Sequence, residues 1–187
     1  MSNSQLQLFT LTLVLLTALS PALLSHARAS SAAAAQRDHL TEQETDLVRA
    51  AQELDRRMEV FVKAIDRRLL VISGTHATSS KSESKQARKD AETWGELPTG
   101  TKAELLSDVA RIFDEAITNI DDASTRAPQS KLLPKALTKL AEASTRILAQ
   151  LTPLRATAST TAEREALEQA IENAQTILEA ARRTSKT

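Results

Sequence analysis

The sequence contains no cysteine and no tyrosine, and only 2% of its residues are aromatic. Without cysteine the chain forms no disulfide bond and no thiolate metal site, and it lacks the thiol that carries the lipid of a lipoprotein. Because aromatic side chains are so few, a core has to be built from aliphatic ones, and alanine and leucine are abundant. This composition is typical of an α-helical bundle.

Glycine and net charge are also scarce. The three glycines, Gly74, Gly95 and Gly100, all fall between segments of periodic hydrophobicity, which indicates that they mark the ends of elements. The 24 lysines and arginines are balanced by 24 aspartates and glutamates. Nucleic acid is not expected as a partner, since neutralising phosphates requires a basic excess.

The most specific signal lies at the N-terminus, where residues 8–24 form an uncharged apolar run. It is followed by Ala27-Arg28-Ala29, a small-x-small pattern that signal peptidase could cut before Ser30. We therefore predict a signal peptide at residues 1–29 and a periplasmic or secreted protein. No lysine or arginine precedes Leu8, so an uncleaved membrane anchor stays open, because a run of about 17 residues approaches the minimum for a spanning helix.

The remaining chain is predicted to be one domain. Residues 30–38 are rich in alanine and serine and are expected to be a flexible lead-in. Residues 39–187 are expected to form a single helical-bundle domain, interrupted by a polar linker at 75–89 that carries no apolar periodicity.

The first predicted helix spans residues 39–73. Thr41 and Glu44 form a capping box at its start, and Gly74 supplies a stop. Its apolar residues recur in steps of four and three, at Leu47, Ala51, Leu54, Met58, Phe61, Ile65, Leu69 and Ile72. A continuous helix of this length would measure about 50 Å.

Three further helices follow the same logic. The second begins with the capping box of Thr101 and Glu104 and ends near Arg126, and the third begins at residues 130–134 and is expected to end rather than kink at Pro153. The last begins at Thr160 with Glu163. The expected fold is an all-α, antiparallel up-and-down bundle of four long helices. The main alternative is a three-helix bundle from which the first helix projects or pairs in a dimer.

A repeat within the first helix supplies the candidate binding residues. The segment LDRRMEV at 54–60 recurs as IDRRLLV at 65–71. Helical geometry places Arg57 and Arg68 at the edge of the apolar seam and Arg56 and Arg67 toward solvent. We expect Arg57 and Arg68 to meet carboxylates of neighbouring helices or an anionic group on a partner, since arginine favours such bidentate pairing.

Catalytic chemistry finds little support in the sequence. His39 and His76 are the only histidines after the predicted cleavage site, and neither a G-x-S-x-G elbow nor a glycine-rich phosphate loop is present. The last helix has no histidine for haem, and no Glu-x-x-His motif suggests a di-iron core. Several acidic residues lie four positions from a basic one, as on a solvated helix surface, and are expected to pair along their own helices: Arg49 with Glu53, Glu59 with Lys63, Arg111 with Glu115 and Glu142 with Arg146. No enzyme activity, catalytic residue, metal site or cofactor is therefore expected.

The expected function is that of an exported cell-envelope protein acting as a non-enzymatic interaction or structural module, through a protein partner or self-association. This prediction is based on the wide apolar arc of the first helix, which extends from Val60 through Leu54 to Val48. The alternative is a small-ligand carrier, in which the linker and residues 94–98 cover an apolar cavity in the bundle. A membrane is expected to be contacted only by the N-terminal segment, if that segment is uncleaved.

Overall fold

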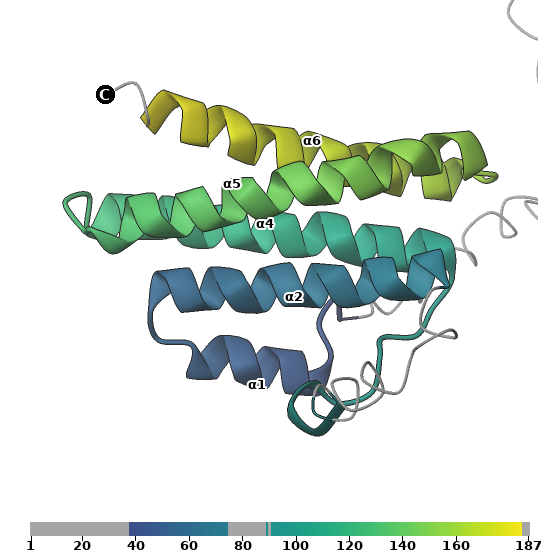
Figure 1. Cartoon of the computed structure of the whole chain (residues 1–187), viewed down its shortest axis with the longest axis horizontal. Coiled ribbons are helices and arrows are strands. Elements are labelled where there is room, and N and C mark those ends of the chain that lie inside the picture. The colour runs from purple at the N-terminus through teal and green to yellow at the C-terminus, as the bar shows by residue number, and fades with distance from the viewer. Residues whose placement is uncertain (1–37, 75–88, 90, 185–187) are drawn as a thin grey trace, which may run out of the picture. The chain divides into compact units, whose positions relative to one another are not determined.

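The computed structural model describes residues 38–74, 89 and 91–184, shown in colour in Figure 1. All regular elements of this described part are helices, which confirms the predicted all-α class. They are α1 (Glu42–Ala50), α2 (Leu54–Ser73), α4 (Lys102–Arg126), α5 (Leu132–Leu151), the short 3-10 helix η2 (Thr152–Thr157) and α6 (Thr161–Thr184). The predicted signal peptide at 1–29 and nearly all of the lead-in at 30–38 and the linker at 75–89 lie outside the described residues.

The helix ends follow from local sequence. Thr41 with Glu44, and Thr101 with Glu104, form complete capping boxes at the starts of α1 and α4. At the start of α6 the Thr160 hydroxyl accepts from the backbone N–H of Glu163 as predicted, and the Glu163 carboxylate accepts from the backbone N–H of Ser159. The α5 helix ends at Leu151, before Pro153, as predicted. Within the described residues no helix is both long and apolar enough to cross a membrane.

The prediction of a single helix over residues 39–73 is wrong. The chain leaves the helical path at Ala51, Gln52 and Glu53, which we call the hinge, and α2 runs back along α1 in the opposite direction (Figure 1). Neither glycine nor proline occurs in the hinge. Across the break α1 and α2 are joined by a local hydrogen bond from Arg57 Nε to the Ala51 carbonyl oxygen at 3.1 Å and by the pair of Arg68 with Glu44.

The long helices α2, α4, α5 and α6 pack around one core, and consecutive ones run in opposite directions (Figure 1). The helices α2 and α6 each lie against both α4 and α5. Neighbouring helices are nevertheless not all antiparallel. Asp55 and Asp66 of α2 pair with Lys135 and Arg146 of α5, so these two helices run side by side in the same direction.

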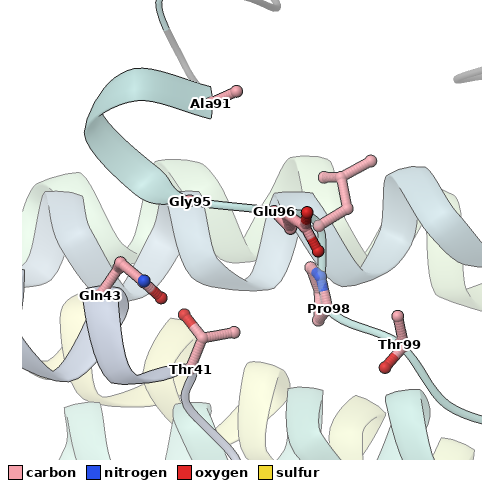
Figure 2. Close-up of a pocket in the computed structure, with 8 residues that line it drawn as sticks. Thr41, Gln43, Ala91, Gly95, Glu96, Pro98 and Thr99 are labelled. Carbon is pink, nitrogen blue, oxygen red and sulfur yellow. The ribbon is translucent and has the colours of Figure 1, made fainter.

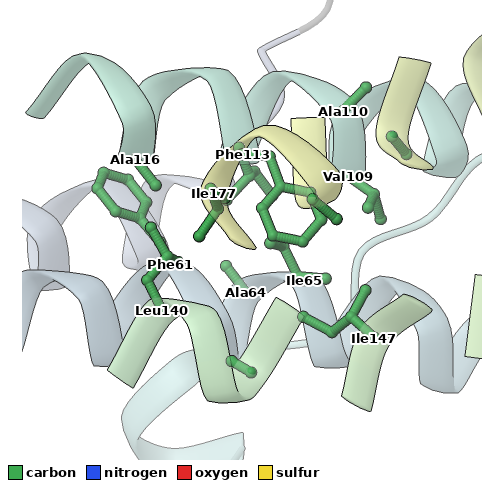
Figure 3. Close-up of a cluster of buried hydrophobic side chains, with 14 of the residues drawn as sticks. Phe61, Ala64, Ile65, Val109, Ala110, Phe113, Ala116, Leu140, Ile147 and Ile177 are labelled. Carbon is green, nitrogen blue, oxygen red and sulfur yellow. The ribbon is translucent and has the colours of Figure 1, made fainter. Parts of the chain in front are cut away.

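The core is aliphatic with two aromatic rings at its centre, Phe61 and Phe113 (Figure 3). Both rings are fully buried, together with Ile65, Leu140 and Ile147 from α2 and α5. The helix α1 differs, because its single buried residue is Glu44. Among the described helices α1 lies against α2 alone. The apolar contact of α1 with the bundle is limited to partly buried side chains such as Val48, and its one fully buried side chain is a carboxylate.

Candidate functional site

Glu44 is the centre of a buried charge cluster between α1 and α2. Its carboxylate is fully buried and lies 2.8 Å from Nη2 of Arg68 and 3.3 Å from Nε of Arg67. The same carboxylate accepts from the backbone N–H of Thr41 in the capping box. One side chain therefore both begins α1 and joins it to α2.

Arg68 links α1 to the rest of the bundle. It is only 1% exposed, and it donates to the carbonyl oxygens of His39 at 2.6 Å and Ala64 at 2.8 Å. Its Nε lies 3.7 Å from a carboxylate oxygen of Asp108 on α4. A buried guanidinium needs several such partners, because desolvating its charge without them is costly. The prediction that Arg68 meets carboxylates of neighbouring helices agrees with these contacts, although the side chain is fully buried and not at the edge of the seam.

The prediction that Arg67 points into solvent is wrong, since its side chain is 5% exposed. The guanidinium donates to three successive carbonyl oxygens, those of Trp94, Gly95 and Glu96, and its Cζ lies 5.8 Å from the centre of the Trp94 ring. Helix α1 and the loop after Trp94 cover the face of α2 that a straight helix would leave in water. Residues 91–94 form a helical turn, and the loop then approaches α1.

Gly95 allows the chain to turn from Trp94 into the loop. Its backbone has φ of 68°, a left-handed conformation that favours glycine. A Cβ atom at this position would lie 2.9 Å from the side-chain Cδ of Gln43 on α1. The loop therefore lies against the Gln43 side chain of α1 on one side and is bonded to Arg67 on the other.

Arg57 holds the opposite end of α1. Besides its bond to the Ala51 carbonyl, it donates to the side-chain oxygen of Asn119 on α4 at 2.9 Å. It thus meets neutral oxygens rather than the predicted carboxylate. The arginines Arg57, Arg67 and Arg68, which we call the arginine row, together hold both ends of α1 and the adjoining loop. The binding of an external partner by Arg57 and Arg68 stays a prediction.

The segment before α1 adds a contact to α4. Nε2 of His39 lies 2.7 Å from a carboxylate oxygen of Glu115, and Leu40 is buried in the core. Glu115 was expected to pair with Arg111 along its own helix, yet it also reaches this segment. Residues 39 and 40 are therefore held through the His39 carbonyl oxygen, which accepts from Arg68, and through both of their side chains.

A ladder of ion pairs joins α2 to α5 on another face. Its rungs are Asp55 with Lys135, Glu59 with Lys139 and Asp66 with Arg146, and each joins residues 80 positions apart. The hydrogen bond from Lys135 holds the pKa of the Asp55 carboxyl below its ordinary value, and the one from Lys139 does the same for the pKa of Glu59. Asp55 is fully buried, whereas the lysines reach solvent.

Sequence reasoning missed the buried carboxylates Asp55 and Asp108, and assigned Glu44 only a capping role. A signal was present for Asp108, because it lies three positions after Leu105 and four before Ile112, on the apolar face of its helix. A carboxylate on an apolar face needs a buried cationic partner. For Glu44 no such signal exists, since its partners become neighbours only after the hinge folds α1 back.

A hollow of about 530 Å³ lies outside the core, between the start of α1 and the loop (Figure 2). Thr41 and Gln43 form one wall, and residues 95–99 form the other, with Ala91 at the rim. This differs in position from the apolar bundle cavity expected for a small-ligand carrier. Across the described ranges, no group of three or more histidine, aspartate or glutamate side chains is placed to hold a metal ion.

Comparison of the chain with models of protein families, with curated proteins and with solved structures finds no match. The class that the described part defines is an all-helical bundle with an N-terminal helix docked by buried ion pairs. Because a helical fold alone does not define a function, the docking of α1 is the structural feature from which a function can be inferred.

Proposed function

We propose that this protein is a non-enzymatic interaction module of the cell envelope, in which the bundle of four long helices presents a binding site for a helix. The observation that carries the proposal is the way α1 is held. It lies against α2 as a bound helical peptide would, with the arginine row at its two ends and one buried acidic side chain, Glu44, as its anchor. The signal-peptide pattern at residues 1–29 supports the location.

The site has a definite chemical preference. A helix that replaced α1 would need a carboxylate at the position of Glu44, because Arg67 and Arg68 are both nearly buried there and two unpaired guanidinium charges are strongly unfavourable. The carbonyl oxygens at its end would accept from Arg57. The expected partner is thus a helix with an acidic residue near its start.

The wide apolar arc of the first helix is a weaker support than the sequence suggested. Val48 and Leu54 are partly buried against the core in the hairpin, so the hairpin itself covers part of that arc. The proposal therefore depends on the docking contacts and not on unpaired apolar surface.

The test is affinity capture from the envelope fraction with the full chain, expressed from its own start and purified as the host processes it, with its mass measured by light scattering. The double variant Arg57→Gln, Arg68→Gln should lose the captured species. Arg56→Gln is the matched control, since Arg56 is exposed on the same helix and its hydrogen-bonded ion pair is with Glu59 of α2 itself. A strictly monomeric chain that captures nothing, or capture unaffected by the double variant, would contradict the proposal.

The alternative, a small-ligand carrier, is favoured by one observation, the hollow beside the loop at residues 95–99. Trp94, the single tryptophan of the chain, directly precedes Gly95 of the lining, so its fluorescence is a probe for an occupant that moves this loop. A panel of lipids and metabolites that leaves the emission unchanged would remove this alternative.

A further inference from the structure

The hinge is the place where the local sequence and the fold disagree. Ala51, Gln52 and Glu53 are all residues with high helix propensity, and the apolar steps of four and three continue through them from Leu47 to Met58. Yet the chain is not helical there, and Glu53 begins α2 without a side-chain cap. The sequence of the hinge thus supports a second conformation, in which α1 and α2 form one continuous helix.

That second conformation is unfavourable for a single chain. Straightening the hinge removes Glu44 from Arg67 and Arg68, leaves their buried charges without this carboxylate, and frees the Ala51 carbonyl from Arg57. These contacts are all lost at the same time, because each of them joins α1 to α2. A second copy of the chain in the same conformation supplies every missing partner.

We propose that two copies exchange their α1 helices, so that α1 of each copy occupies the site on the arginine row of the other. The residues 42–73 then form one helix of about 48 Å in each chain. Glu44 of one copy pairs with Arg67 and Arg68 of its partner, and the contacts seen within the chain are re-formed between chains. This inference rests on the proposed function and names the helix that the site binds, which is the α1 of a second copy.

The exchange requires little rearrangement elsewhere. Among the described helices α1 lies against α2 alone, so α4, α5 and α6 keep their contacts with one another, and the second copy re-forms the core contacts of Leu40 and Val48 and the pair of His39 with Glu115. Domain swapping of this kind is a low-cost route to dimers when a short connection can straighten. The hinge gains helical hydrogen bonds when it straightens, which offsets the loss of chain entropy on association.

Proline at position 53 separates the two conformations. In the hairpin, Glu53 has φ of −82°, which proline adopts with little adjustment, and its N–H donates to no acceptor within the described residues. In a continuous helix, proline at this position removes a backbone hydrogen bond and clashes with the preceding turn. Glu53→Pro should therefore keep the folded monomer and prevent the exchange, whereas the matched Glu53→Ala removes the same side chain and permits it.

The experiment measures the mass of the full chain, as the host processes it, by light scattering over a range of concentrations, after refolding from denaturant at high and at low protein concentration. We expect a dimer fraction for the unmodified chain and for Glu53→Ala. For Glu53→Pro the dimer dissociation constant should rise by roughly a hundredfold or more, because each of the two long helices carries the proline. Circular dichroism checks that all three proteins fold.

Every outcome bears on the exchange. A dimer that persists in Glu53→Pro would overturn it, since the two copies would then associate through another surface with the hinge closed. Monomers in all three proteins at every concentration would overturn it as well. A complex with a different protein, without self-association, would overturn the exchange but leave the proposed function standing, so the two failures are distinguishable.

Complementation gives a second test that does not depend on the hinge. Glu44→Ala impairs the donated helix, and Arg68→Ala impairs the site that receives it. In a mixture of the two variants, an exchanged heterodimer contains one intact pair of Glu44 with Arg68, which neither variant possesses alone. The mixture should form at least several-fold more dimer than either variant alone, and equal dimer in all three samples would contradict the exchange.

Discussion

The bundle core and the docking of α1 are stabilised in different ways. The four long helices bury aliphatic side chains and two phenylalanine rings around a common centre, whereas α1 buries a single residue, the carboxylate of Glu44. Apolar burial is non-directional and accumulates over many contacts. Paired buried charges depend on a few specific atoms, and removing one partner leaves the other uncompensated.

This contrast indicates how each region can fail. The core loses stability in proportion to the apolar surface removed from it, and all its helices are affected together. The docking of α1 is lost as a unit when one charge is removed, while the bundle remains packed. The predictions below test that separation.

The largest expected effect is on the core. Phe113 is fully buried, and Phe113→Ala should lower the free energy of unfolding of the whole domain by about 3–5 kcal/mol, because it leaves a cavity where the ring was. Denaturant unfolding followed by circular dichroism measures this loss. Leu132→Ala, at one of the exposed leucines, is the control and should change little. A loss below about 1 kcal/mol for Phe113→Ala would contradict the central position of this ring.

The second effect is local to α1. Arg68→Met leaves Glu44 buried with Arg67 as its remaining cation and should lower the free energy of opening α1 by roughly 3 kcal/mol. Native-state hydrogen exchange should show lost protection in α1 and retained protection in α5 and α6. The double variant Glu44→Met, Arg68→Met should recover only part of the loss, since Glu44 is then no longer a buried carboxylate short of a cation, but Arg67 loses its carboxylate and Asp108 loses Arg68. Equal loss of protection in every helix would show that the two regions are not separable.

The third effect is a dependence on pH at the ladder between α2 and α5. The pKa of Asp55 is lowered in the folded protein, mainly by the hydrogen bond from Lys135. A carboxylate with a lowered folded pKa contributes stability above its unfolded value of 3.8, and this contribution is lost as the pH falls below that value. The unfolding midpoint should therefore fall with acidification, and Asp55→Asn should flatten the profile. An unchanged slope in the variant would count against the pairing.

The smallest effect concerns the hinge. Glu53 begins α2 without capping it, so Glu53→Ser should stabilise the start of α2 by up to about 1 kcal/mol and favour the hairpin over the continuous helix. Glu53→Ala controls for removal of the charge. Thermal unfolding measures the gain. A Ser variant no more stable than the Ala variant would indicate that the backbone N–H groups of the first turn of α2 do not need a side-chain cap.

Local patterns predicted the helices and most of their ends. The capping boxes of Thr41 and Thr101 and the stop before Pro153 depend on neighbours within a few residues, which the sequence displays directly. The hinge could not be predicted, because no glycine or proline marks it and its residues favour helix. Its cause is the sum of contacts to α1 from residues distant in the sequence.

The error over Arg67 follows from the same omission. A straight helix 39–73 places this side chain in water, and only the hairpin and the loop at 94–96 enclose it. For Arg68 contact with apolar surface was expected, because its neighbours along α2 are apolar whichever way α1 runs, but its complete burial was not. Glu59 and Arg146 were expected to pair along their own helices, yet the structure joins them to α5 and α2 respectively.

The ladder between α2 and α5 also discriminates between alignments of the two helices. If α5 slid by four residues in one direction, Lys139 would face Asp55, but Ala143 and Gln150 would face Glu59 and Asp66, and two of the attractions would vanish. A slide in the other direction would bring Glu142 opposite Asp66 and introduce a repulsion. Exposed ion pairs add little free energy individually. Their spacing nonetheless selects one axial register of α5 against α2, which a repetitive aliphatic surface of alanine and leucine would not distinguish from its neighbours.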